Sequence, residues 1–206
     1  MNKRKIVAFG DSLTAGSALR AGERNWTDIL AQRLNAEVLN RGVGGHTSTQ
    51  GLARMETDVL RQAPDVVILC FGMNDHVITD AEGNAKTPPE QFRKNLTEML
   101  RRVREIGAVP VLVTPTAVIE VYYFTRHPRE WYGEKGANGQ LARYCDIIRK
   151  VAKEERVALA DLFTESQGWD LSELLRTPDN GGFEDGVHPY GRGIDFYAEV
   201  ILPVLK

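Results

Sequence analysis

Short apolar stretches alternate with longer amphipathic stretches along most of this chain. Continuous apolar runs of a few residues are typical of strands that are buried on both faces of a parallel sheet. The sequence therefore predicts five such strands, at residues 5–9, 37–40, 65–71, 109–114 and 157–162.

Apolar residues recur at helical spacing between the predicted strands. This alternation of strand and helix favours a parallel sheet with helices on both faces. The predicted helices cover residues 26–34, a segment from near Thr49 with Leu52, Met55 and Val59 on one face, a segment after Pro88-Pro89, a segment after Asn138, and a last helix from about Gly193.

Composition limits the class of protein. A chain of 206 residues with 42% hydrophobic content suits one domain over residues 1–206 with a well-buried core. The net charge of -2 gives no reason to expect a nucleic acid or an anionic membrane as a partner, and a homo-oligomer stays open. Cys70 and Cys145 lie in apolar patterns, which predicts core residues rather than a disulfide.

The beginning of the chain bears on location. A first strand from Lys5 leaves no room for a signal peptide, and no later segment reaches the length of a membrane span. The sequence therefore predicts a cytoplasmic protein, unless a signal peptide has been removed.

Three residues at the two ends of the chain can form a nucleophilic site. Ser12 follows the first strand, and the carboxyl ends of strands in open α/β sheets face a crevice. Asp185 and His188 lie three residues apart in a glycine-rich loop. In the common strand order 2-1-3-4-5 the fifth strand is an edge, so we expect residues 163–184 to cross the strand ends and bring His188 to Ser12.

Two further turns are expected at the same rim. Residues 40–47 are rich in glycine, and residues 72–76 contain Asn74. A backbone N–H at a glycine and an asparagine amide can both donate to a developing oxyanion. Either turn by itself is also ordinary turn chemistry.

Taken together, these stretches resemble the four blocks of the SGNH, or GDSL, hydrolases. The blocks are Gly10-Asp11-Ser12-Leu13, the turn that ends in Gly45-His46-Thr47, Gly72-Met73-Asn74-Asp75, and Asp185-Gly186-Val187-His188. Residues 49–54 are also similar to the multifunctional bacterial lysophospholipases and thioesterases of that family. The resemblance implies a three-layer α/β/α flavodoxin-like domain with a five-stranded parallel sheet, and ester hydrolysis without metal or organic cofactor.

The resemblance also implies roles. Ser12 would be the nucleophile, His188 the base and Asp185 the residue that orients it. The oxyanion would be bound by the backbone N–H groups of Ser12 and Gly45 and by the side-chain amide of Asn74. Other polar neighbours are less defined: Asp11 is expected to tie the turn together, Asp75 and His76 to be structural or rim residues, and His46 to have an open role that includes substrate binding.

Residues 115–137 are the aromatic segment, because they hold five aromatic side chains in a chain with only 8% aromatic residues. These side chains could stack on a sugar or cover a short acyl group, or they could pack on a second subunit. His127, in the same segment, is expected to be exposed rather than in contact with substrate. The candidate substrate-binding residues here are Tyr122, Tyr123, Phe124, Trp131 and Tyr132.

The substrate itself is less constrained than the reaction. We expect a short acyl ester, such as an acetyl ester, of a carbohydrate or other small alcohol. A lysophospholipase or thioesterase, or an acyltransferase that uses the same site, remains an alternative.

Parts of the sequence also resemble two other classes of site. A metal hydrolase could use His46, His76 and His188 with aspartates, but no pair shows zinc-ligand spacing. An FMN-binding flavodoxin-like module could hold phosphate at residues 10–17, and it would be yellow, but it leaves Asp185 and His188 unexplained.

Overall fold

The computed structural model describes residues 3–206 and is built on a parallel sheet of five strands. The strands pair in the order β2-β1-β3-β4-β5, and every pair is parallel. The α/β fold and the strand order are therefore confirmed. The strands are β1 (Lys5–Gly10), β2 (Glu37–Gly42), β3 (Val66–Cys70), β4 (Val109–Val113) and β5 (Ala158–Ala160).

The strand β5 is shorter than the predicted stretch of residues 157–162. Asp161 ends the strand because its side chain accepts a hydrogen bond from the N–H of Thr164 and so caps a following helix, α7 (Leu162–Ser166). Leu162 is apolar and buried, which made it resemble a strand residue in the sequence.

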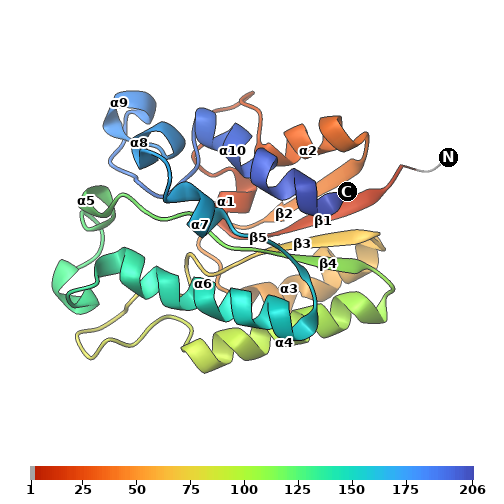
Figure 1. Ribbon diagram of the computed structural model, residues 1–206, viewed down its shortest axis with the longest axis horizontal. Helices are drawn as coiled ribbons and strands as arrows, with labels where there is room; N and C mark the ends of the chain where they lie inside the picture. The colour runs from red at the N-terminus through yellow and green to blue at the C-terminus, as the bar shows by residue number, and fades with distance from the viewer. Residues whose placement is uncertain (1–2) are drawn as a thin grey trace.

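Helices cover both faces of the sheet, as Figure 1 shows. One face carries α1, α2 and α10, and the other carries α3, α4 and α6. The predicted helices are all present, with boundaries within a few residues of those expected. They are α2 (Trp26–Leu34), α3 (Ser48–Asp58), α4 (Pro89–Glu105), α6 (Gly136–Glu155) and α10 (Arg192–Ile201). The structure adds the one-turn helix α1 (Ser12–Ala15) and the short 3₁₀ turns η1 (Leu60–Gln62) and η3 (Leu202–Leu205).

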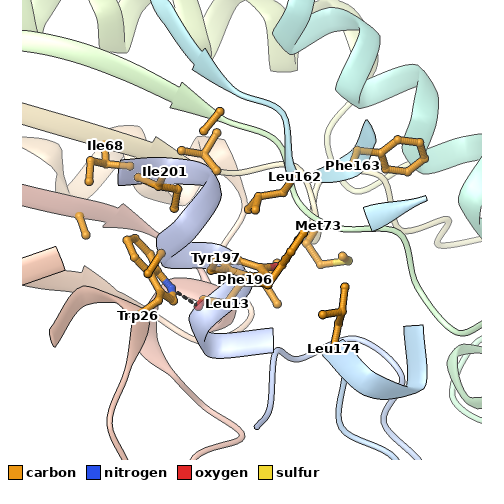
Figure 2. Close-up of a cluster of buried hydrophobic side chains, with 14 of the residues drawn as sticks. Leu13, Trp26, Ile68, Met73, Leu162, Phe163, Leu174, Phe196, Tyr197 and Ile201 are labelled. Carbon is orange, nitrogen blue, oxygen red and sulfur yellow. Dashed lines mark hydrogen bonds between the residues drawn. The ribbon is translucent and has the colours of Figure 1, made fainter. Parts of the chain in front are cut away.

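Two apolar cores form because alternate side chains of each strand point to opposite faces. Ile6 and Ala8 of β1 belong to one core, which Trp26 of α2 and Ile201 of α10 complete (Figure 2). Val7 and Phe9 of the same strand belong to the other core, beneath α3, α4 and α6. Cys145 is buried, Cys70 is partly buried, and both thiols are free.

Three long connections leave the carboxyl ends of the strands. The first runs from β3 to α4 and is pinched by a bridge between Ile78 and Ala85. The second includes α5 (Glu120–Tyr123) and η2 (Arg129–Tyr132), and the third includes α7, α8 (Leu171–Leu174) and α9 (Pro178–Gly181). In Figure 1, α5, α8 and α9 lie at the end of the molecule away from both termini. Within residues 3–206, no helix has the length and apolar character needed to cross a membrane.

Candidate active site

Ser12 occupies the first position of α1, immediately after β1. Asp11 caps this helix, because its Oδ1 accepts a hydrogen bond of 2.9 Å from the N–H of Leu13. The side chain of Ser12 is almost buried, at 9% exposure. A cap followed by a one-turn helix therefore presents the hydroxyl at the carboxyl end of the sheet.

Neighbouring elements hold α1 in place. The indole N–H of Trp26 donates to the carbonyl of Leu13 at 3.0 Å, the bond drawn in Figure 2. The amides of Asn25 and Asn40 both donate to the carbonyl of Thr14, at 3.0 and 2.7 Å. Thus α2 and β2 satisfy carbonyl groups at the end of a helix too short to satisfy them itself.

Close packing at the end of β2 also requires a glycine. A Cβ on Gly42 would lie 2.1 Å from the backbone nitrogen of Ala15, so any side chain there would push α1 away. The position of Ser12 in α1 therefore depends on Gly42, which is the last residue of β2.

Asp11 is buried directly beside Ser12 in the chain. Burial raises the pKa of its carboxyl to about 7, against the opposing effect of the hydrogen bond from Leu13. Its second oxygen, Oδ2, has no hydrogen-bond partner within residues 3–206. These contacts fit the expectation that Asp11 ties the turn together.

His188 and Asp185 form a close pair. The Nδ1 atom of His188 lies 2.8 Å from Oδ2 and 3.0 Å from Oδ1 of Asp185. Burial would raise the pKa of Asp185, but the hydrogen bond and charge of His188, with the charge of Arg126, hold that pKa below its usual range. An ionised carboxylate on Nδ1 keeps the proton there and leaves Nε2 as the basic nitrogen.

The third long connection brings this pair back across the strand ends, as predicted. The N–H of Ile119 donates to the carbonyl of Gly186 at 2.8 Å, and the N–H of Arg176 donates to the carbonyl of His188 at 2.9 Å. A bridge between Leu175 and Pro189 extends the same contact. His188 and Ser12 consequently line one cavity.

The turns after β2 and β3 meet at the same rim because Gly10 pairs with Gly42 on one side and with Cys70 on the other. The side-chain amide nitrogen of Asn74 donates to the carbonyl of His46 at 3.1 Å. Gly45 has a φ of 77°, a conformation that favours glycine.

The backbone donors at this rim are free in the described part of the chain. Within residues 3–206, the N–H groups of Ser12 and Gly45 donate to no protein acceptor. The Asn74 amide carries a second N–H besides the one held by His46.

Asp75 and His76 are fully buried, so neither is a rim residue. Asp75 accepts hydrogen bonds from the Ser48 hydroxyl at 2.6 Å and from the Gly72 N–H at 3.1 Å, which joins the β3 turn to α3. His76 packs beneath the aromatic segment, where burial lowers its pKa to about 4. Of the two roles expected for Asp75 and His76, structural or rim, their burial fits the structural role.

The cavity that holds Ser12 has a volume of about 230 Å³. Asn74 and His188 line the cavity together with Ser12. The other lining residues are the apolar Met73, Val77 and Val187, the basic Lys86 and Arg126, and the aromatic Tyr123 and His127. A second hollow of about 280 Å³, between Leu19 and Asp195, contains neither Ser12 nor His188.

Most aromatic side chains of the aromatic segment do not face the cavity, contrary to the expectation that they contact substrate. Of its five predicted substrate-binding side chains, only Tyr123 lines the cavity. Tyr132 is buried and bonds through its hydroxyl to the hydroxyl of Tyr123 at 2.9 Å and to the N–H of Ile78 at 3.2 Å. Phe124 and Trp131 pack against the apolar core, and the Cβ of Tyr122 lies against Gly186. None of these four residues lines the cavity, and only Tyr123 keeps its position as a candidate for substrate contact.

The histidines outside the pair also have defined surroundings. His127 was expected to be exposed, but it is half-buried, lines the cavity and stacks on Tyr123 with ring centroids 4.3 Å apart. His46 does not line the cavity; its Nδ1 accepts a hydrogen bond from Arg54 at 3.2 Å.

Sequence reasoning missed four residues at or near the site. Lys86, Val77 and Arg126 line the cavity, and Arg54 joins the turns beneath it. The connection between β3 and α4 is longer than an ordinary loop of such a sheet, which was the available signal for Val77 and Lys86. Arg126 lies in the aromatic segment, whose composition gives no signal that a cation there faces the cavity.

Comparison with known proteins places this geometry in a family. The model of the GDSL-like lipase/acylhydrolase family matches residues 8–195. This chain belongs to that family. The resemblance of its four blocks to GDSL hydrolases is thereby confirmed, and the chain is a carboxylic ester hydrolase that acts on a small-molecule ester.

Individual relatives agree with this membership. An arylesterase of Vibrio mimicus is 26% identical over 202 residues, which are 96% of this chain and 86% of that protein. A protein of Bacillus subtilis named uncharacterized lipoprotein YqeF is 36% identical over 169 residues, or 76% of this chain and 69% of its own length. The crystal structure of an acetyl xylan esterase, AlAXEase, has a TM-score of 0.75 at 26% identity and covers 98% of this chain and 100% of its own.

Proposed function

We propose that this esterase removes short acyl groups, acetyl above all, from a carbohydrate or other small alcohol, with Ser12 as the nucleophile. The observation that carries the proposal is the small cavity of about 230 Å³ shared by Ser12 and the Asp185-paired His188. Sites for drug-sized ligands usually have about 300 to 1,000 Å³. A short acyl chain fits such a space better than a fatty acyl chain.

The proposed mechanism is acyl transfer through an acyl-enzyme. The Ser12 hydroxyl attacks the ester carbonyl while Nε2 of His188 takes its proton, and the tetrahedral intermediate collapses as His188 returns that proton to the leaving alcohol. Water then attacks the acyl-enzyme with the same general base, which regenerates Ser12 and releases the acid. Asp185 holds the imidazole and stabilises its cation throughout.

Three donors are proposed for the oxyanion. They are the N–H groups of Ser12 and Gly45 and the amide of Asn74, in agreement with the absence of other protein acceptors for the two N–H groups within residues 3–206. The hydrogen bond from Asn74 to the His46 carbonyl fixes the amide before substrate arrives.

The side chains that line the cavity suit a short acyl group. Met73, Val77 and Val187 offer apolar contact to an acyl methyl, and Tyr123 offers one aromatic surface. Among the relatives, one is named an acetyl xylan esterase and others are named isoamyl acetate-hydrolyzing esterase homologues, which is consistent with a short acyl group.

The testing experiment is a chain-length profile. We expect kcat/KM for p-nitrophenyl esters to be highest for acetyl to butyryl and to fall by about tenfold or more for dodecanoyl, since the longer chain exceeds the cavity. Acetylated sugars would then be compared with their butyrylated counterparts. A maximum at decanoyl or dodecanoyl would contradict the proposal and favour a lysophospholipase or thioesterase.

A further inference from the structure

Two basic side chains line the cavity that contains Ser12. Lys86 comes from the connection between β3 and α4, and Arg126 comes from the aromatic segment. No aspartate or glutamate is among the residues that line this cavity in the described part of the chain. This local excess of positive charge contrasts with the net charge of -2 of the whole chain.

The backbone of Lys86 is fixed although its side chain is exposed. Its N–H donates to the carbonyl of Val77 at 2.9 Å, beside the bridge between Ile78 and Ala85. Within residues 3–206, no carboxylate lies within ion-pair distance of the Lys86 ammonium. Its charge is therefore available to a ligand in the cavity.

Arg126 is anchored at one edge of its guanidinium. Its Nη2 donates to the carbonyl of Asp185 at 2.8 Å and lies 3.5 Å from the Asp185 carboxylate. That carboxylate already accepts the closer hydrogen bond from His188 at 2.8 Å. Because a guanidinium has five N–H donors, the anchored group keeps donors for a second acceptor, and its side chain is 46% exposed.

The charges of both cations reach a third residue that lines the cavity, His127. Burial first, and then the charges of Arg126 and Lys86, lower the pKa of His127. His127, whose ring stacks on Tyr123 with centroids 4.3 Å apart, lines the same cavity. Two cations in a cavity whose described lining contains no carboxylate suit an anionic ligand.

We propose that the natural substrate of this esterase carries a carboxylate or a phosphate, which Lys86 and Arg126 bind while Ser12 attacks the ester. This inference rests on the proposed ester hydrolysis at Ser12. Arginine offers a planar pair of donors and lysine a point charge, and both groups suit either anion. The anion would also be attracted into the cavity before contact, since a cleft of one charge sign concentrates ligands of the other.

The test compares three acetyl esters of similar shape. They are para-acetoxybenzoate, para-acetoxyphenyl phosphate and the neutral para-acetoxybenzamide. The measured quantity is kcat/KM for each anionic ester divided by kcat/KM for the amide, in the wild type and in Lys86→Gln, Arg126→Gln and the double variant. Taking ratios between variants removes differences in leaving group and any general effect of Arg126 on Asp185.

The matched control is Lys153→Gln, which removes one positive charge from the exposed face of α6. It should leave the ratios unchanged. We expect each cavity variant to lower the anionic-to-neutral ratio by about 3- to 10-fold, and added salt to lower the wild-type ratio in the same direction. The two anionic esters distinguish a carboxylate substrate from a phosphate substrate. The ester whose anionic-to-neutral ratio falls more in the cavity variants carries the group that Lys86 and Arg126 bind better.

Three other results would contradict either this inference or the proposed function. Equal ratios in the wild type, Lys86→Gln and Arg126→Gln would overturn the inference while leaving ester hydrolysis at Ser12 intact. An equal drop in Lys153→Gln would also overturn it, because net charge rather than the cavity would then control the ratio. If the wild type hydrolyses none of the three esters and does not hydrolyse p-nitrophenyl acetate, the proposed function itself is overturned.

Discussion

The side-chain amide nitrogen of Asn74 lies 3.1 Å from the backbone oxygen of His46, so the turn after β3 is joined to the turn after β2. This bond restricts the orientation of the amide, which is one of the three donors proposed for the oxyanion. Preorganised donors of this kind are effective because they need no reorganisation during the reaction.

Replacement of Asn74 by alanine should therefore affect the chemical step. We expect Asn74→Ala to lower kcat by about 10² to 10³, with much less change in KM, because the bond strengthens only as charge develops. Steady-state kinetics on p-nitrophenyl acetate measures both constants. A change confined to KM would make Asn74 a residue of ground-state binding instead.

The pair formed by His188 and Asp185 leads to a second prediction. Asp185→Asn should lower kcat by about 10⁴, because the amide can favour the wrong imidazole tautomer. The same substitution in a Ser12→Ala background should cause almost no further loss, since the three residues would act as a unit. A full additional loss in that background would show that Asp185 acts independently of Ser12.

Arg54 is predicted to stabilise the turns beneath the site. Its guanidinium donates to the carbonyls of Gly10 and Arg41 and to Asp58, at 2.7, 2.9 and 2.7 Å. Arg54→Met removes all three of these hydrogen bonds, although the Gly10 carbonyl still accepts from the N–H of Val43 at 3.1 Å. The substitution should lower the free energy of unfolding by about 2 to 4 kcal/mol.

The control for Arg54 is Arg61→Met. Arg61 pairs with Glu56 at 3.4 Å where both side chains are largely exposed, at 70% and 52%. Its loss should change the free energy of unfolding by less than about 0.5 kcal/mol. Urea unfolding of both variants gives the comparison, and equal losses would remove the special role assigned to Arg54.

Buried His76 gives a pH-dependent contribution to stability. Burial lowers its pKa from 6.5 to about 4, so between these values the unfolded chain binds a proton that the native state does not. The contribution is fully present above about pH 6.5 and is lost as pH falls toward 4. Asp11 acts in the opposite direction, because burial raises its pKa to about 7 and the native state holds a proton there.

A variant separates His76 from Asp11. His76→Gln retains an oxygen that can accept from Tyr123 but does not titrate. The stability advantage of the wild type over this variant should be smaller by about 2 kcal/mol at pH 4.5 than at pH 7. Urea unfolding at the two pH values measures it. An advantage that is the same at both values would mean that His76 takes up its proton in the native state as readily as in the unfolded one.

Much of the fold could be predicted because it depends on local patterns. Short apolar runs and helical spacing are properties of neighbouring residues, and they located the strands and the main helices. The helix α2 was predicted with the boundaries that it has, from Trp26 to Leu34. The strand order was predicted as the common order of such sheets, and it is the order observed. Given that order, Ser12 and His188 can share a cavity only if residues 163–184 cross the strand ends, and they do share one.

The parts that were missed depend on contacts between distant segments. The aromatic content of residues 115–137 does not report which rings turn inward, and Tyr132 turns inward because Ile78 and Tyr123 offer partners for its hydroxyl. His76 is buried beside the rings of Tyr123 and Tyr144, which are distant from it in the sequence. Lys86 reaches the cavity only because the β3–α4 connection folds back on itself.

The most direct test of the account is the activity of Ser12→Ala. The variant should keep the wild-type circular dichroism spectrum and thermal midpoint, since it removes one oxygen at the start of α1. Its kcat on p-nitrophenyl acetate should fall by about 10⁴-fold or more if Ser12 is the nucleophile. A folded Ser12→Ala enzyme with more than about a tenth of the wild-type kcat would contradict the account, because acyl transfer would then proceed without the group to which the whole site is assigned.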